Sequence, residues 1–188
     1  MTRRNLLRGL LAAGLWNALT GRGEAAQPVR DMKGIAELQK NWQALLAPDF
    51  RAPLPTEELK LADAEWRKRL SPLAYEVLRK EGTERAGTSA LNGEKREGVF
   101  VCAGCDLPVF TSAMKYESGT GWPSFFTTIP GAFATKTDYK LFLPRTEYHC
   151  KRCGGHHGHV FDDGPQPTGQ RWCNNGVALR FVPRAGKA

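Results

Sequence analysis

The stretch VFVCAGCDLPVFT, residues 99–111, places a CxxC pair between two short runs of β-forming residues. Valine and phenylalanine favour strands, and the glycine inside the CxxC pair favours a tight turn between them. Similar short apolar runs, separated by glycine and proline, continue to residue 182. The sequence therefore predicts a mainly β (α+β) domain with antiparallel strands at residues 99–101, 107–111, 125–129, 139–143 and 177–182.

A second CxxC pair, Cys150 and Cys153, follows the first pair, Cys102 and Cys105, after 44 intervening residues. Two such pairs supply the four thiolates of a closed, tetrahedral zinc site, which stabilises a fold directly. The alternative is a disulfide within each pair, but loops this small gain little stability from a disulfide. Attachment of a c-type haem is excluded, because neither pair is followed by histidine. The sequence therefore predicts a structural zinc ion as cofactor, held by Cys102, Cys105, Cys150 and Cys153.

Helical patterns precede the β region. Apolar residues at helical spacing predict a docking helix at residues 35–46, and the proline-rich residues 47–55 predict a linker. Residues 56–70 predict a second helix, because acidic side chains lie at its start and basic side chains at its end. A third helix is predicted between Ser71, an N-cap followed by proline, and Gly82.

The first 26 residues have the features of an export signal. Arg3 and Arg4 precede the apolar run 9–19, and small residues follow it. The run is shorter than the roughly 20 apolar residues of a membrane span, and the paired arginines resemble the twin-arginine signal for folded proteins. Because export after folding around zinc would protect the thiols from oxidation, we expect a periplasmic protein. The chain is expected to divide into a signal at 1–26, a helical preface and linker at 27–55, and one domain at 56–184.

The net charge of the chain is moderate once this signal is set aside. The 188 residues carry a formal net charge of +8, and removing residues 1–26 leaves 23 basic and 18 acidic residues. No block of five consecutive Lys or Arg remains. The sequence therefore gives no reason to expect a nucleic-acid partner, and its 41% of hydrophobic residues excludes wholesale disorder.

Cys173 is the cysteine that remains when four are assigned to zinc. A free cysteine is most often a small, buried, apolar residue. Arg171 lies two positions away, however, and a neighbouring guanidinium favours the reactive thiolate. The sequence therefore marks Cys173 as a candidate nucleophile.

Three histidines lie within four residues, upstream of this cysteine. Strand alternation predicts His157 and His159 on one face and His156 on the other, unless a bulge at Gly158 changes the alternation. The three rings suggest a second metal site or acid–base catalysis, and we favour acid–base catalysis.

Three blocks of sequence carry a resemblance to a known family. They are GTGWPSF at residues 119–125, HHGHVFDDGP at 156–165 and PTGQRWCNN at 167–175. These blocks resemble the signature motifs of the methionine sulfoxide reductase B family, and the resemblance spans residues 56–183. It implies a fold of two antiparallel sheets with short helices packed at one edge. It also implies reduction of the R epimer of methionine sulfoxide, free or within oxidised proteins.

The resemblance also implies roles for single residues. The catalytic residues would be Cys173 as nucleophile with His159, His156 and Asn175, and the substrate-binding residues would be Trp122 and Arg171. Thr120 stands where many relatives carry the cysteine that resolves the oxidised nucleophile. We therefore expect regeneration by an external thiol reductant such as a thioredoxin-like protein. We also expect the protein to be a monomer.

The residue chemistry fits this reaction. Sulfoxide reduction needs a thiolate to attack sulfur and an acid to protonate the oxygen, because a bare oxide is a poor leaving group. His159 is the first choice for the acid, with His156 assisting, and the oxidised enzyme would carry a sulfenic acid. Without the family resemblance, Trp122 is as consistent with packing in the core as with contact to the substrate. Two alternatives remain open: a zinc-knuckle module that binds nucleic acid, and a hydrolase with a Cys–His pair.

Overall fold

A computed structural model describes residues 31–140 and 143–184, so the predicted signal at 1–26 lies outside the described residues. The described chain contains three α-helices and nine strands. The helices are α1 (Met32–Lys40), α2 (Asp63–Arg69) and α3 (Pro72–Lys80). The strands are β1 (Gly98–Cys102), β2 (Pro108–Thr111), β3 (Lys115–Tyr116), β4 (Ser124–Phe125), β5 (Phe133–Asp138), β6 (Arg145–Cys150), β7 (His156–Phe161), β8 (Arg171–Asn174) and β9 (Leu179–Pro183). None of the helices in this part of the chain has the length and apolar character needed to cross a membrane.

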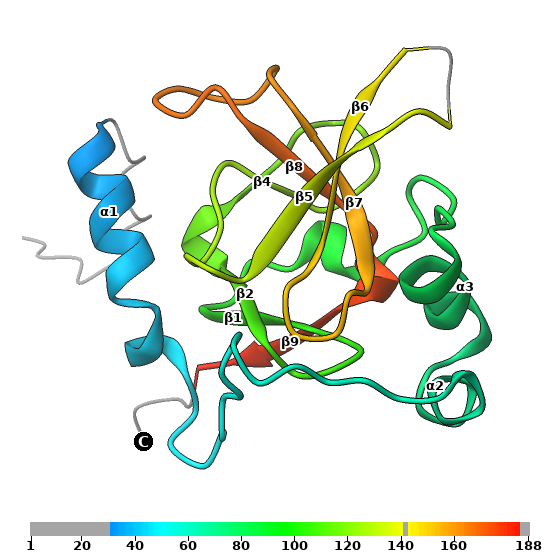
Figure 1. The fold of residues 1–188 in the computed structure, drawn as a ribbon. Coiled ribbons are helices and arrows are strands. Elements are labelled where there is room, and N and C mark those ends of the chain that lie inside the picture. The colour runs from blue at the N-terminus through cyan, green and yellow to red at the C-terminus, as the bar shows by residue number, and fades with distance from the viewer. Residues whose placement is uncertain (1–30, 141–142, 185–188) are drawn as a thin grey trace, which may run out of the picture.

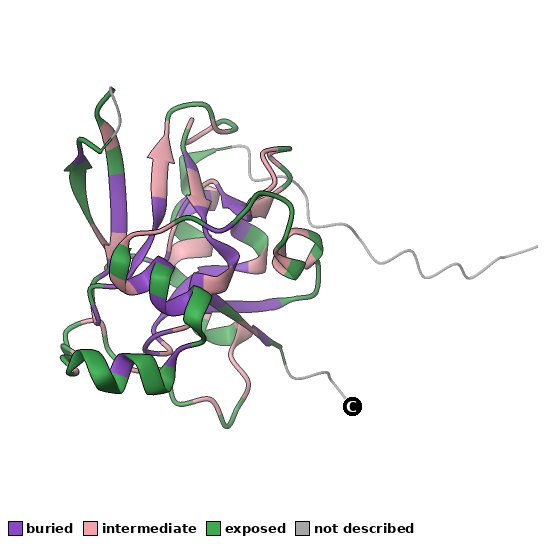
Figure 2. Ribbon diagram, turned by 90° about the vertical axis from the view of Figure 1, so that its right-hand side faces the viewer, coloured by how far each residue is buried: buried purple, intermediate pink, exposed green. Residues whose placement is uncertain are grey.

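The strands form two antiparallel sheets (Figure 1), which confirms the predicted mainly β fold. One sheet has the order β2-β1-β9, and the other has the order β3-β4-β8-β7-β6-β5. The sheets meet through aromatic rings: Phe110 of β2 stacks on Phe125 of β4 with centroids 3.9 Å apart, and Phe100 of β1 meets Phe125 edge-on at 5.1 Å. All three rings are fully buried, and the buried residues gather where the two sheets face each other (Figure 2).

Helix α3 begins and ends where the sequence predicts. The Ser71 hydroxyl caps it by accepting a hydrogen bond from the Ala74 N–H at 3.2 Å, and a proline occupies the first turn. The helix ends at Glu81, which has left-handed backbone geometry (φ 55°), and the Gly82 N–H then donates to the carbonyl of Glu76. The buried face of α3 packs against β7, so the helix covers part of the six-stranded sheet.

Helix α2 begins at Asp63, so the predicted start at residue 56 is wrong. The preceding segment is held away from helical geometry because the Leu59 N–H donates to the carbonyl of Arg152 at 2.8 Å. This bond ties the segment to the second CxxC loop. The Glu65 side chain then caps the helix by accepting the backbone N–H just before it, at 3.0 Å.

The predicted docking helix is confirmed as α1, followed by a 3-10 turn at Trp42–Leu45. Ile35 of α1 is 3% exposed, and the Gln39 amide donates to the Thr127 hydroxyl at 2.8 Å. Further apolar residues, up to Phe50, pack against the core. The helical preface and the first part of the predicted linker are therefore docked on the β domain.

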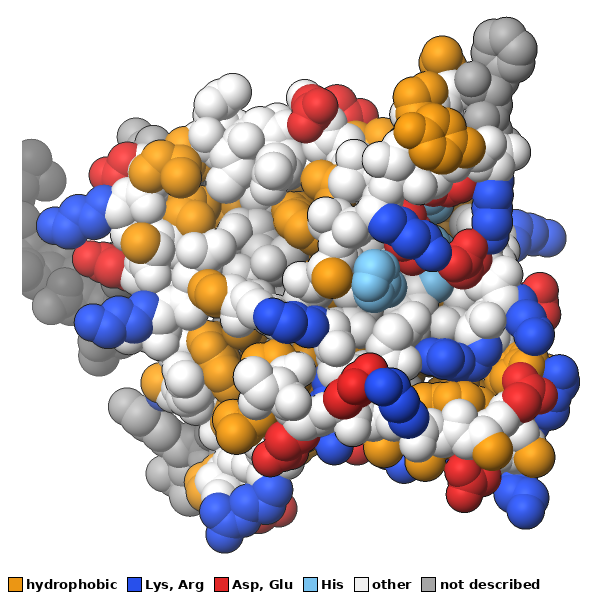
Figure 3. All heavy atoms as spheres, viewed as in Figure 1, with side chains coloured by type: hydrophobic (Ala, Val, Ile, Leu, Met, Phe, Trp, Pro, Cys, Tyr) orange, Lys and Arg blue, Asp and Glu red, His pale blue; other side chains and the backbone are white. Residues whose placement is uncertain are grey.

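The strand predicted at residues 139–143 is wrong. β5 ends at Asp138 and β6 begins at Arg145, so the described residues of the predicted strand (139, 140 and 143) lie outside both strands. β5 and β6 pair as a long hairpin that projects from the six-stranded sheet (Figure 1). Tyr139 and Leu143 are 77% and 72% exposed, and hydrophobic side chains are visible at the hairpin tip in Figure 3. The described ends of the apolar run are therefore exposed, whereas β5 has three exposed polar residues at its centre and gives no strand signal. The strand predicted at 125–129 is also shorter than expected, since β4 ends at Phe125.

Candidate active site

Four buried cysteines converge where two loops meet, as the sequence predicts. The sulfur atoms of Cys102, Cys105, Cys150 and Cys153 all lie within 4.8 Å of one another. The close Sγ–Sγ contacts run between the pairs, at 3.7 Å from Cys102 to Cys153 and 3.5 Å from Cys105 to Cys150. These distances approach the edge of about 3.8 Å that zinc–sulfur bonds of about 2.3 Å give a tetrahedron, and they far exceed a disulfide bond of about 2.05 Å. The cluster could therefore hold one metal ion, and its geometry does not favour a disulfide within each pair.

Both CxxC loops share one backbone geometry. The residue after the second cysteine has positive φ in each loop, 61° at Asp106 and 69° at Gly154. In each loop the N–H of that residue donates to the carbonyl of the first cysteine, at 2.9 Å and 2.8 Å. The Arg152 guanidinium of the second loop also donates to the carbonyl of Cys105 at 2.9 Å. The two loops are therefore similar turns joined by hydrogen bonds around the thiols.

A β-bulge in β7 decides which histidines face the candidate site. The pairing between β6 and β7 skips one residue, which is His157. The predicted simple alternation is therefore wrong, because His156 and His159 come together with ring centroids 5.5 Å apart. His157 instead lies fully buried in the core, where burial lowers its pKa to about 4. The three rings consequently do not converge on a shared metal ion.

Gly158 allows β7 to approach β8 closely. A Cβ atom at this position would lie 1.9 Å from the carbonyl oxygen of Cys173, so a larger residue would push the strands apart. At the next position His159 pairs directly with Cys173 across the two strands. The half-buried candidate nucleophile and the candidate acid are therefore neighbours because two adjacent strands place them there.

Cys173 and His159 line one cavity of about 220 Å³. Trp122 forms another wall, and its indole N–H donates to the carbonyl of Glu84 at 3.1 Å, which fixes the orientation of the ring. The remaining walls come from Thr83, Arg145, Gly158, Phe161, Asn174 and Asn175. Of the predicted site residues, the cavity brings together Cys173, His159, Trp122 and Asn175, whereas His156 and Arg171 do not line it.

Each of the two site histidines contacts a buried carboxylate that the sequence analysis did not identify. His159 donates from Nε2 to Asp138 at 2.7 Å, and Arg145 donates to the same carboxylate oxygen at 2.6 Å. His156 lies behind them with its Nδ1 atom 2.7 Å from a carboxylate oxygen of Glu147. Both carboxylates are almost completely buried. The two imidazole rings are therefore held in fixed orientations at the cavity.

Competing neighbours control the protonation of His159. Burial lowers the pKa of its ring, the hydrogen bond to Asp138 opposes this shift, and the charge of Arg145 reinforces it. Asp138 is itself an anion, because the Lys140 backbone N–H and the bonds from His159 and Arg145 hold its pKa well below the usual range. His159 is therefore mostly neutral at pH 7 with its proton on Nε2, and Nδ1 is the nitrogen left for a substrate.

Cys173 is less acidic than its sequence neighbourhood suggests. Burial raises the pKa of its thiol above the ordinary value and outweighs Arg171 and the Thr120 hydroxyl, which both lower the pKa. Arg171 is already paired, since it donates two hydrogen bonds to Asp163 at 2.7 Å and 2.8 Å. The predicted effect of Arg171 has the right direction, but burial decides the net shift.

Thr120 lies beside Cys173 and is part of a small group of hydroxyls. Its hydroxyl is one of the groups that hydrogen-bond to the thiol. It also lies 2.9 Å from the hydroxyl of Ser118, which in turn lies 2.7 Å from that of Ser124. The position next to the candidate nucleophile therefore carries hydrogen-bonding oxygen, and the other four cysteines are all in the buried cluster.

Asn175 and Glu84 shape the loop that follows Cys173. The Asn175 side chain accepts from the Glu84 N–H at 2.9 Å and donates to the carbonyl of His157 at 2.9 Å. The buried Glu84 carboxylate accepts from the N–H groups of Gly176 and Val177 at 2.5 Å and 3.0 Å. Asn175 therefore borders the cavity as predicted, but its amide holds backbone in place.

Asp138, Arg145 and Glu147 come from the β5–β6 hairpin and were not predicted as site residues. Their strands lack apolar alternation, so the hairpin itself was not predicted. One usable signal was present: Asp138 and Arg145 flank the apolar run at its two ends. Charged residues at both ends of such a run are typical of a turn whose strand ends can pair, as they do here at 2.6 Å.

Part of the chain matches a known family model and several known proteins. Residues 70–183 match the family model described as the SelR domain. A peptide methionine sulfoxide reductase MsrB of Pseudomonas putida is 50% identical over 123 residues, which cover 65% of this chain and 92% of that protein. A protein of the same name from Leptospira interrogans is 46% identical over 125 residues, which cover 66% of this chain and 95% of that protein.

The match to a plant relative covers a smaller share of that protein. Peptide methionine sulfoxide reductase B1, chloroplastic, of Arabidopsis thaliana is 48% identical over 126 residues, which cover 66% of this chain and 62% of that protein. The matched region contains both CxxC pairs, the histidine block and Cys173. The chain therefore belongs to the SelR family of peptide methionine sulfoxide reductases, oxidoreductases that reduce methionine sulfoxide.

Proposed function

We propose that this oxidoreductase reduces the R epimer of methionine sulfoxide, free or in oxidised proteins, with Cys173 as its nucleophile. The observation that carries the proposal is the pairing of Cys173 with His159 on adjacent strands beside one small cavity. In that cavity Trp122 offers an apolar face to the S-methyl group of the substrate. The family assignment favours this reaction over a Cys–His hydrolase and over a zinc-knuckle module that binds nucleic acid.

The proposed reaction transfers the sulfoxide oxygen to the enzyme. The Cys173 thiolate attacks the sulfoxide sulfur while protonated His159 gives its proton to the oxygen, so that the substrate S–O bond breaks. The attack forms a bond between the Cys173 sulfur and the substrate sulfur, and the oxygen leaves as hydroxide. Hydroxide then attacks the Cys173 sulfur and breaks this S–S bond, so the net products are methionine and a sulfenic acid on Cys173. The substrate sulfur gains two electrons in this step, and the Cys173 sulfur loses two.

The pKa shifts oppose the reactive protonation state. Burial raises the pKa of Cys173 and lowers that of His159, so most molecules hold a neutral thiol and a neutral imidazole at pH 7. The Asp138 carboxylate raises the pKa of His159 and keeps a proton on Nε2. We therefore assign Asp138 the role of orienting His159 with Nδ1 toward the substrate and of increasing the imidazolium fraction.

The remaining predicted residues support the two reacting groups: Arg171 and His156 do not line the cavity, whereas Asn175 does. Arg171 lowers the pKa of Cys173 and so increases its thiolate fraction. His156 packs edge-on against His159 and supports its ring. Asn175 holds the loop that follows the nucleophile.

We also propose that a structural zinc ion occupies the cysteine cluster. Four thiolates suit zinc, and a site with four protein ligands leaves no open position for a substrate. Four buried thiols close together oppose one another's ionisation, and a divalent cation removes that penalty. Zinc held by Cys102 and Cys150 would join β1 to β6, and thus the smaller sheet to the larger one.

Recycling of the oxidised enzyme is proposed to use an external reductant. The side chain beside Cys173 belongs to Thr120, and the proposed zinc ion holds the other four thiols. A thiol from outside would attack the sulfenic acid, release water and form a mixed disulfide, which a second thiol then reduces. A dithiol protein of the thioredoxin type has this chemistry.

Export of the protein as a folded monomer is a separate proposal, supported by residues 1–26. Arg3 and Arg4 with the short apolar run favour the twin-arginine route to the periplasm. Residues 1–30 fused to a reporter that must fold before export should carry it out of the cytoplasm. Replacing both arginines with lysine should keep the reporter inside the cell, and continued export would contradict the route.

The activity test compares the two epimers of methionine sulfoxide. The protein should form methionine from the R epimer in the presence of dithiothreitol and should leave the S epimer unchanged, as measured by amino-acid chromatography. Equal rates on both epimers, or no methionine from either, would overturn the proposal. An acyl-enzyme formed on an ester substrate would instead support the hydrolase.

A further inference from the structure

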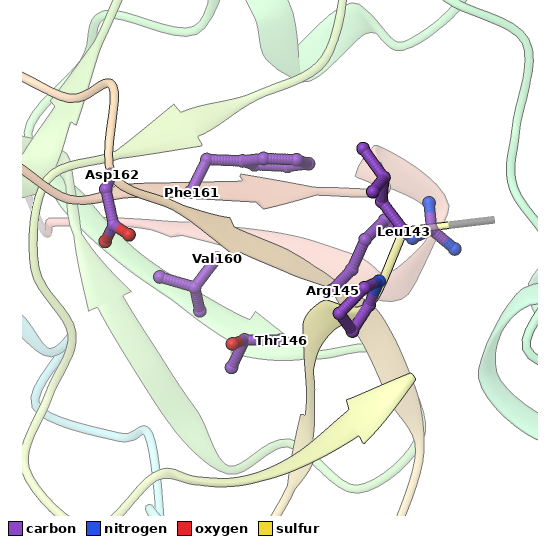
Figure 4. Close-up of a pocket in the computed structure, with 7 residues that line it drawn as sticks. Leu143, Arg145, Thr146, Val160, Phe161 and Asp162 are labelled. Atoms are coloured by element: carbon purple, nitrogen blue, oxygen red, sulfur yellow. The ribbon is translucent and has the colours of Figure 1, made fainter. Parts of the chain in front are cut away.

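A second cavity, of about 610 Å³, lies beside the cavity that contains Cys173. Its walls include Leu143 and Pro144 from the hairpin and Val160 and Phe161 from β7 (Figure 4). We call these four residues and the space between them the outer pocket. Arg145 also lines it, but its charge is paired with Asp138 at 2.6 Å. The outer pocket is therefore mainly apolar.

The two cavities share part of their walls. Phe161 and Arg145 line both the outer pocket and the cavity of Cys173. Figure 4 shows the Phe161 ring extending toward Leu143 across the outer pocket. The guanidinium of Arg171 lies 4.2 Å from the centroid of the Phe161 ring and steadies it. The two cavities therefore adjoin at Phe161 and Arg145, so the outer pocket lies next to a molecule held at Cys173.

We propose that the outer pocket binds an apolar side chain of an oxidised polypeptide, next to its methionine sulfoxide. This inference rests on the proposed function, since it needs the sulfoxide at Cys173. The occupant is a polypeptide rather than a free amino acid, because the pocket lies beyond the cavity that the sulfoxide side chain fills.

The chemistry of the walls selects the neighbouring residue. Leu143 is 72% exposed, so an apolar side chain bound there removes apolar surface of both partners from water. The exposed carboxylate of Asp162 at the rim disfavours an acidic neighbour. Leucine or phenylalanine next to the sulfoxide should therefore be favoured over serine, and serine over aspartate.

The test measures kcat/KM on blocked peptides that carry the R-sulfoxide between two leucines or between two serines. The intact protein should prefer the leucine peptide by about tenfold, through a lower KM with similar kcat. Leu143→Ser should reduce this preference to about twofold and leave the reduction of free methionine sulfoxide unchanged. Leu54→Ser is the matched control, because Leu54 is 58% exposed and lines neither cavity.

A second variant guards against indirect effects of the hairpin. Val160→Thr keeps the side-chain shape and adds a hydroxyl to the pocket wall, so it should also weaken the preference. Equal kcat/KM for the two peptides in the intact protein, or a preference that survives both variants, would overturn the subsite while leaving the proposed function standing. Failure to reduce even free methionine sulfoxide would overturn the proposed function itself. If Leu143→Ser changed only the rate with a dithiol protein, the pocket would belong to the reductant and the proposal would be wrong.

Discussion

The five cysteines occupy two regions of the molecule in which the same thiol group has different surroundings. Four of them lie in the buried cluster, within 4.8 Å of one another, on two turns that belong to different sheets. Cys173 lies alone on β8, half-buried, with its side chain at a cavity. Each cluster thiol has three others beside it, whereas Cys173 has a guanidinium, a hydroxyl and a pairing with His159.

This difference shows that grouping and access, rather than burial alone, separate a metal ligand from a nucleophile. Burial raises the pKa of Cys173, and both burial and the neighbouring thiols raise that of Cys102. A shared cation would favour all four thiolates of the cluster together, whereas a single cationic neighbour and a hydroxyl favour the thiolate at Cys173. Cys173 is half-buried at a cavity, whereas the four cluster cysteines are buried.

The largest expected effect is that of Cys173→Ser on turnover. A hydroxyl is a far weaker nucleophile toward sulfur, so the rate of methionine formation from the R epimer should fall at least about a thousandfold. Metal content and melting temperature should stay unchanged, because this thiol lies outside the cluster. Substantial residual reduction would place the nucleophile elsewhere.

Cys150→Ser, unlike Cys173→Ser, should change the metal content and the stability of the protein. Losing one of four ligands should release the metal and lower the free energy of unfolding by about 3 kcal/mol or more, since metal binding is coupled to folding. Elemental analysis and chemical denaturation measure the two effects, with Cys173→Ser as the cysteine control. A native protein that contained two disulfides and no zinc would contradict this prediction.

The cysteine cluster and helix α3 could be predicted from the sequence, whereas the start of α2 could not. The cluster was predictable because each CxxC pair is a local sequence pattern, and two such pairs commonly bind one zinc ion. Helix α3 was predictable because Ser71 and the proline after it determine its start locally. The start of α2 was not, because a long-range bond from Leu59 to Arg152 decides it.

The surroundings of Cys173 depend on contacts that no local pattern contains. The bulge at His157 exchanges the faces of the histidines, and only its pairing with β6 defines it. Asp138 reaches His159 across 21 positions of sequence, from a hairpin whose strands lack apolar alternation. Burial of Cys173 is likewise a tertiary property, and it reverses the net pKa shift that Arg171 alone suggests.

The shifted pKa values of Cys173 and His159 determine how the reaction rate depends on pH. The reactive form needs the base form of Cys173, whose pKa is raised, and the acid form of His159, whose pKa is lowered. The population of this form is constant between the two pKa values, falls below that of His159, and falls above that of Cys173. The profile of kcat/KM should therefore be a broad plateau with these two limbs.

Asp138→Asn tests the assignment of the acid limb. Removing the carboxylate removes an interaction that raises the pKa of His159, so the acid limb should move to lower pH. The value of kcat/KM on the plateau should fall about tenfold for each pH unit by which the acid limb moves. Asp162→Asn, which removes an exposed carboxylate that does not bond to His159, is the control on free methionine sulfoxide. An acid limb that stayed in place or moved to higher pH would contradict the role of Asp138.

The smallest change concerns recycling and depends on Thr120. One equivalent of the R epimer without reductant should give one equivalent of methionine and leave a sulfenic acid on Cys173, visible as one added oxygen by intact mass and as a dimedone adduct. Thr120→Cys places a second thiol beside Cys173, so the same experiment should give an internal disulfide, if the two Cα atoms can approach within about 7 Å, and no added oxygen. Reduction by a thioredoxin-type protein should then become a few times faster, because exchange at a disulfide is the chemistry of that reductant. Thr120→Ser keeps the hydroxyl and should behave like the native protein. A disulfide to Cys173 in the oxidised native protein would contradict this prediction and would mean that a thiol of the cluster is free to react.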